Sequence, residues 1–199
     1  MLAISTTRQR ITAPGTTLEL LVLASGSGGC IGVDLDSGAL TRATYPERTL
    51  VPLVPFDLAS AVVGGSETDP GPDPVHPEEV DLAALPKLTG HVGRRKAERW
   101  LRPLLHPASE LILGFPGPAV PFWELAGDRP SLTIIEPERP PRLIHRRGEA
   151  RLRCRFAWRN LWHELPVVGT GEEGDRRLLI ALSAPLQGYC YKVVAGLLP

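Results

Sequence analysis

Arginine occupies every second position of one short stretch of the chain, Arg151, Arg153 and Arg155, and apolar residues fill the positions between them. Because alternate residues of a β-strand point to opposite faces, the pattern predicts a strand with one basic and one apolar face. A guanidinium group forms paired hydrogen bonds with phosphates or carboxylates, so the basic face is a candidate site for a polyanion. The alternative is a solvated sheet face, or a face that docks on an acidic part of the same protein.

The residues that follow predict a β-hairpin whose turn is Arg159-Asn160. In that register Arg155 lies opposite Glu164, as an ordinary cross-strand ion pair, and Phe156 lies opposite His163. The apolar face then contributes core side chains, for which we expect Leu152, Phe156, Trp158 and Leu165.

Sheets that bind nucleic acid combine basic groups with exposed aromatic rings on the same face, because bases stack on rings. Phe156 and Trp158 point away from the arginines in the predicted strand. The alternation therefore favours a solvated or internally docked face over a nucleic-acid site.

A second group of arginines belongs to the one convincing helix, near 93–102. Its inward stripe has helical spacing and comprises Ala97, Trp100, Leu101 and Leu104. Pro103 should end or kink the helix, since proline lacks the backbone N–H. The outward arginines Arg94, Arg95 and Arg99 are candidate binding residues together with Arg151, Arg153 and Arg155.

Charge is unevenly distributed although the formal net charge is zero. Residues 1–90 hold five basic and eleven acidic side chains, a balance of −6, and residues 91–199 balance at +6. Residues 64–80 are acidic and rich in proline and glycine, which predicts a mobile linker between a small β subdomain (1–63) and a β-rich domain (81–199). We expect its acidic residues to compete for the basic surface, namely Glu67, Asp69, Asp73, Glu78 and Glu79.

Motifs of catalysis and cofactor binding are incomplete in this sequence. The glycine-rich stretch 26–29 lacks the third glycine of a dinucleotide fingerprint and favours a hairpin loop. The Asp34-Leu35-Asp36 triplet lacks the later oxygen ligands of a calcium loop, and His163-Glu164 lacks the second histidine of a zinc motif. We therefore expect no cofactor, no bound metal and no catalytic residue, with Cys30 the least implausible nucleophile.

The three cysteines are far apart, an odd number without paired spacing, so reduced thiols in a cytoplasmic protein are expected. No apolar run approaches the ~18 residues of a membrane span. Arginine makes up 19 of the 22 basic residues, a bias that favours a bacterial origin.

Short apolar runs separated by turn residues indicate a mainly β, β-rich α+β fold, either an antiparallel sandwich or an open barrel. The predicted strands are 18–24, 30–35, 39–45, 110–113, 120–125, 131–136, 142–145, 151–158, 162–168, 178–183 and 189–197, and 57–63 is either a strand or a helical turn.

These patterns leave three classes of function open. The first is a non-catalytic interaction module that binds protein partners. The second is a module that binds nucleic acid or another polyanion through the arginine-rich strand and helix. The third is an enzyme whose site is assembled from distant loops. A β-sandwich or barrel hosts all three, so the fold alone does not choose between them.

Overall fold

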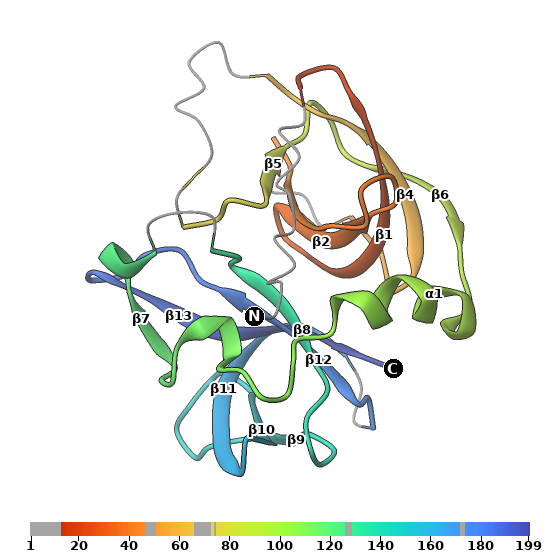
Figure 1. Ribbon diagram of the computed structural model, residues 1–199. Coiled ribbons are helices and arrows are strands. Elements are labelled where there is room, and N and C mark those ends of the chain that lie inside the picture. Colours follow the sequence, from red (N-terminus) through yellow and green to blue (C-terminus); the bar gives the residue numbers. More distant parts are fainter. Residues whose placement is uncertain (1–12, 47–50, 66–72, 74, 126–128, 172–173) are drawn as a thin grey trace, which may run out of the picture.

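The computed structural model describes residues 13–46, 51–65, 73, 75–125, 129–171 and 174–199, and its regular structure is mainly β (Figure 1). The first sheet contains β1 (Thr17–Gly26), β2 (Gly29–Asp34), β3 (Leu40–Thr44), β4 (Asp57–Val62), β5 (Glu79–Asp81) and β6 (Lys87–His91). The second contains β7 (Ala119–Pro121), β8 (Leu132–Ile135), β9 (Arg142–Ile144), β10 (Arg153–Trp158), β11 (Leu161–Thr170), β12 (Arg177–Leu182) and β13 (Tyr189–Leu198).

Both sheets are mixed rather than purely antiparallel. The first has the order β5-β3-β2-β1-β4-β6, and the second has the order β8-β12-β13-β11-β10-β9 with β7 paired to β13. The parallel pairs are β3–β5 and β11–β13, each joined by a connection much longer than a hairpin. The expected β-rich fold with one principal helix is confirmed. It differs from the predicted antiparallel arrangement in the two parallel strand pairs.

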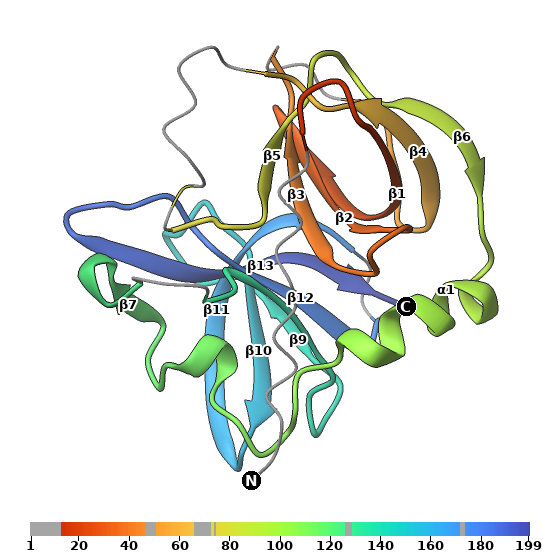
Figure 2. The same cartoon turned by 45° about the horizontal axis from the view of Figure 1, so that its top comes forward.

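The principal helix, α1 (Arg94–Leu101), continues into a 3₁₀ turn, η1 (Arg102–Leu104). Pro103 lies in that turn and marks the change of helical geometry, as predicted. Ala97 and Leu101 are buried, and Trp100 and Leu104 pack partly buried against the same core. This helix therefore covers one end of the space between the two sheets (Figure 1, Figure 2).

Two predicted strands between the helix and β8 are wrong or shortened. Residues 110–113 form irregular backbone and the 3₁₀ turn η2 (Ile112–Gly114), in which Leu113 and Gly114 have φ of 54° and 79°. Such backbone cannot join a β-ladder, but it directs Ile112 and Leu113 into the core. Residues 120–125 split into β7 and the 3₁₀ turn η3 (Phe122–Glu124).

Buried side chains form three clusters, of which one lies between the sheets, one inside the second sheet, and one on the other face of the first sheet. The inter-sheet core unites β1 and β2 with β8, β12, β13 and α1, and it includes Leu21, Val33, Ile134 and Leu179. The core of the second sheet gathers residues from β8 and β10–β13, including Phe156 and Leu165, beneath the 112–125 segment. Because strands from the whole second sheet contribute to one core, that sheet must be strongly curved.

The acidic segment 64–80 is described only in part, and the described part packs against both sheets. Val75 is buried in the core of the second sheet, and the Glu78 carboxylate accepts hydrogen bonds from Ser131 N, Ser131 Oγ and Leu132 N at 2.5, 2.8 and 3.2 Å. These contacts differ from the mobile tether expected at 75–80. Glu67 and Asp69 lie outside the described residues.

His76 connects this segment to the second sheet, at a carbonyl group that Arg42 of the first sheet also reaches. His76 is buried, with Nδ1 3.1 Å from Asp73 Oδ2 and 3.7 Å from Glu79 Oε2. Its Nε2 lies 3.2 Å from the carbonyl oxygen of Leu182, to which Arg42 also donates at 3.1 Å. Asp73, Glu78 and Glu79 are therefore engaged between the sheets rather than at Arg151 or Arg153.

Among the residues that the structure describes, no helix has the length and apolar content needed to cross a lipid bilayer.

Candidate functional site

The β10–β11 hairpin positions the alternating arginines, and its register agrees with the prediction. Arg155 pairs with Glu164, Phe156 with His163 and Cys154 with Leu165. Arg159 and Asn160 have φ of 53° and 60°, the left-handed pair that a two-residue hairpin turn needs to match the strand twist. Asparagine adopts this conformation more easily than most residues, so the turn follows from the local sequence.

The apolar face of β10 points into the core of the second sheet. Phe156, Trp158 and Leu165 are buried, as predicted, whereas Leu152 lies before the strand and is half-buried. The indole N–H of Trp158 donates to the Glu110 carbonyl oxygen at 2.9 Å, which satisfies its only donor group. The arginines consequently occupy the outer face of the sheet.

Trp162 lies on that same outer face, although it was not among the predicted binding residues. It pairs with Ala157 in the β10–β11 register, so its side chain shares the face of Arg153 and Arg155. Trp162 is 56% exposed, and the Arg155 Cζ atom lies 4.9 Å from the centroid of its ring. The predicted register, with Phe156 opposite His163, already places Trp162 on the same face as the arginines. The position of Trp162 could therefore have been predicted from the sequence.

The predicted ion pair between Arg155 and Glu164 is replaced by others. Glu164 Oε1 lies 2.7 Å from Arg146 Nε and 2.8 Å from Arg153 Nε. Arg153 also lies 3.3 Å from the Glu149 carboxylate. The prediction was wrong because Arg155 packs over the Trp162 ring. Glu164 pairs instead with Arg153, its diagonal neighbour on β10, and with Arg146 in the turn before that strand.

Two arginines of the outer face have no acidic partner among the residues that the structure describes. Arg142 of β9 and Arg155 of β10 are directly paired in the ladder, and both are exposed. Like charges directly opposite each other destabilise a sheet, and no carboxylate within the described part of the chain lies at ion-pair distance from either guanidinium group. We call Arg142, Arg155 and Trp162 the basic–aromatic face.

The surroundings of this face are also basic. Residues 138–164 contain eight arginines and three glutamates, a formal balance of +5. Arg151 is exposed two residues before the ion-paired Arg153, the first residue of β10. A ligand at the basic–aromatic face therefore meets a positive local potential although the whole chain is neutral.

The helix arginines belong to a different region of the molecule. Arg94, Arg95 and Arg99 are exposed on α1, and Arg99 lies 6.0 Å from the Trp100 ring. Helix α1 lies beside β6 and the C-terminus in both views, whereas β9 and β10 lie at the other end of the second sheet (Figure 1, Figure 2). Of the six predicted binding residues, the structure brings Arg151, Arg153 and Arg155 together and leaves the helical three apart.

A second exposed tryptophan provides a comparison. Trp123 is 63% exposed and meets Tyr189 edge-on, with 5.8 Å between ring centroids. Phe122, Tyr191 and Leu186 are exposed in the same region of η3 and the β12–β13 connection. Over the ranges that the structure describes, no guanidinium group lies over the Trp123 ring.

The cysteine thiols are poorly suited to nucleophilic chemistry. Cys30, Cys154 and Cys190 are buried and free. Burial raises the pKa of all three thiols, to about 12 for Cys154, so the reactive thiolate is disfavoured at neutral pH. Where the structure describes the chain, no group of three or more His, Cys, Asp or Glu side chains is arranged to hold a metal ion.

The chain matches no model of a known protein family, no curated protein and no solved structure.

Proposed function

We propose that this protein is a non-catalytic module that binds single-stranded nucleic acid through the basic–aromatic face. The observation that carries the proposal is the position of Trp162, exposed beside Arg155. On the same face, neither Arg155 nor Arg142 has an acidic partner within the described ranges of the chain. Of the three classes open from the sequence, this one makes use of both the ring and the unneutralised charges.

The chemistry of a single strand matches this face. Unpaired bases stack on an exposed indole ring, a contact worth about 1–3 kcal/mol per base and tolerant of sequence. Arg142 and Arg155 would contact adjacent phosphates, and Arg151 extends the positive surface beyond the strand end. In duplex nucleic acid the bases are already stacked on each other, so Trp162 favours single strands.

The test is a titration of a fluorescently labelled 20-nucleotide single strand, as RNA and as DNA, followed by anisotropy. Trp162→Ala should weaken binding about 5- to 100-fold through the lost stacking contact. Trp123→Ala removes an equally exposed ring that has no arginine over it, and should leave the affinity within about twofold. Duplex DNA of the same length should bind more weakly than the single strand.

Salt dependence separates the electrostatic part of binding from stacking. With about three phosphate contacts, log K should fall with log salt at a slope near −2, and Arg142→Ala or Arg155→Ala should each reduce the slope by about 0.7. Arg95→Ala on α1 serves as the control for charge loss elsewhere.

Two results would overturn the proposal. One is equal binding by the wild type and Trp162→Ala while the arginine variants lose affinity. The other is binding of polyglutamate as tight as that of the single strand. Either outcome would assign the face to an acidic protein partner instead.

A further inference from the structure

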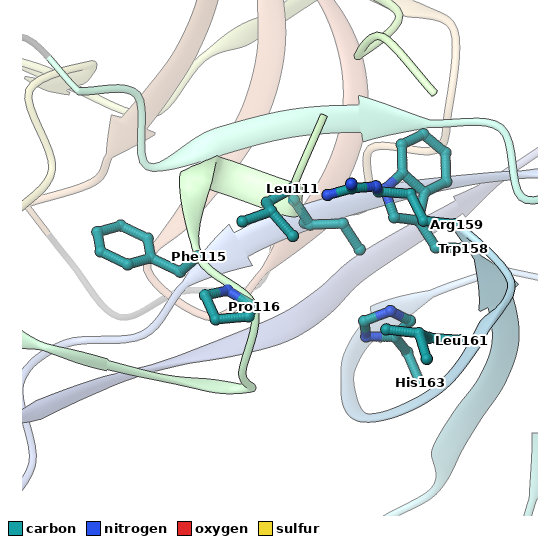
Figure 3. A pocket seen from close by; sticks show the side chains of 8 residues that line it. Leu111, Phe115, Pro116, Trp158, Arg159, Leu161 and His163 are labelled. Atoms are coloured by element: carbon teal, nitrogen blue, oxygen red, sulfur yellow. The ribbon is translucent and has the colours of Figure 1, made fainter. Parts of the chain in front are cut away.

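A cavity of about 170 Å³ lies beside the β10–β11 hairpin (Figure 3). Leu161 and His163 line it, and strand alternation places their side chains on the opposite face from Trp162. Its apolar walls include Leu111, Phe115, Pro116 and Leu161, and its polar lining consists of Arg159 and His163. An apolar cavity of about 150 Å³ accommodates one benzene molecule, so this one has room for a single six-membered ring.

Arg159 supplies a positive charge at this cavity. It belongs to the hairpin turn, with φ of 53°, and its side chain extends toward Leu111 across the cavity (Figure 3). A guanidinium group in this position can form a paired hydrogen bond with a carboxylate.

Lys192 places a second positive charge behind the cavity wall. Its side chain is 2% exposed, and its Nζ donates to the carbonyl oxygen of Phe115, a wall residue, at 2.5 Å. No carboxylate of the described chain lies within ion-pair distance of this ammonium group, and a buried charge without a counter-ion is unfavourable. An anion bound in the cavity would partly offset that cost.

His163 forms part of the wall without adding a charge at neutral pH. Its ring stacks on Phe156 with 5.4 Å between centroids and an interplanar angle of 15°. Burial, and in second place the nearby charge of Lys192, lower the pKa of His163. The neutral imidazole offers a flat surface and hydrogen-bonding capacity to a ligand.

We infer that this cavity binds a small monocarboxylate with a single-ring or similarly compact apolar body. The ring would lie among Leu111, Phe115, Pro116 and Leu161, and the carboxylate would face Arg159. Three independent observations favour a compact anion as the ligand. They are the size of the cavity, the Arg159 guanidinium at its rim, and the buried Lys192 ammonium, which has no counter-ion among the described residues. This site is separate from the basic–aromatic face and does not depend on the function proposed for it.

The experiment compares benzoate with benzamide, a neutral compound of nearly the same shape, by two-dimensional NMR titration of the intact protein. Benzoate should bind at least tenfold more tightly than benzamide, and its largest shifts should fall on residues 111–116 and 158–163. Equal affinity of the two compounds, or shifts elsewhere on the molecule, would refute the inference.

Arg159→Asn removes the guanidinium group while asparagine retains the left-handed turn. This variant should weaken benzoate binding at least tenfold and leave benzamide binding unchanged. Arg147→Asn, in the exposed β9–β10 connection at the other end of β10, removes the same charge away from the cavity and should bind benzoate like the wild type. If Arg159→Asn also binds benzoate like the wild type, the carboxylate is not held at this site and the inference fails.

Discussion

Phe156 is the most informative single residue for the orientation of the hairpin. Its side chain is fully buried, between the ring of His163 and the core of the second sheet. Phe156→Ala should lower the free energy of unfolding by about 3–5 kcal/mol, since it leaves a cavity in a packed core. Urea denaturation measures this, with Leu88→Ala, an exposed position on β6, as the control. A loss below about 1 kcal/mol would contradict the assigned faces.

Lys192 predicts an unusual dependence of stability on pH. Burial lowers its pKa from 10.5 to about 8 in the folded protein, so between these values the unfolded chain binds the additional proton. Stability should therefore rise as pH increases from about 8 to 10.5, by on the order of 3 kcal/mol from this residue alone.

The variant Lys192→Met isolates this contribution, because the other groups that titrate in the same window are unchanged. As pH rises from about 8 to 10.5, the unfolding free energy of the wild type should increase relative to that of Lys192→Met. A difference that stays constant from pH 7 to 10 would show that Lys192 titrates as an exposed lysine does.

At the level of elements, the Arg159-Asn160 turn determines the register of the basic–aromatic face. Asn160 has φ of 60°, a conformation that is strained for a β-branched residue. Asn160→Val should destabilise the protein by about 1–3 kcal/mol, whereas Asn160→Gly should be neutral within about 0.5 kcal/mol. Thermal unfolding of both variants checks this, and equal melting temperatures would mean that the turn does not determine the register.

The same hairpin explains how much could be predicted from sequence. Its alternation and its Asn-containing turn are local signals, so β10, β11, their pairing and the buried Phe156 followed directly. Residues 110–113 are equally apolar, but tertiary packing sets their backbone in a 3₁₀ turn. Strand β5 was missed because its three residues lie in a polar segment and pair only through contacts distant in sequence.

The candidate site was only partly predictable for a related reason. Cross-strand pairing places Trp162 on the same face as Arg155. That Glu164 and Glu149 pair with Arg153, and not with Arg142 or Arg155, depends instead on the side-chain positions in space. Likewise, helix packing rather than sequence separates Arg95 from Arg155.

At the scale of the whole molecule, the two sheets share a core that includes Leu21 and Leu179, and the segment around Glu78 binds them together. We predict a single cooperative unfolding transition, in which fluorescence and circular dichroism coincide. Glu78→Ala should cost about 2–4 kcal/mol by leaving the Ser131 and Leu132 donors without their acceptor. Two separate transitions would indicate that the sheets fold independently.

In the proposed complex Trp162 contacts the bases of a single strand, and its indole N–H signal reports on this contact directly. In a ¹⁵N-labelled sample, comparison with Trp162→Phe identifies that signal, and an unlabelled 10-nucleotide single strand is then added at about 0.1 M salt. The Trp162 indole signal should shift until the protein is saturated, while the Trp123 signal should stay in place. If anisotropy shows that the strand binds but the Trp162 signal does not change, the bases do not stack on Trp162.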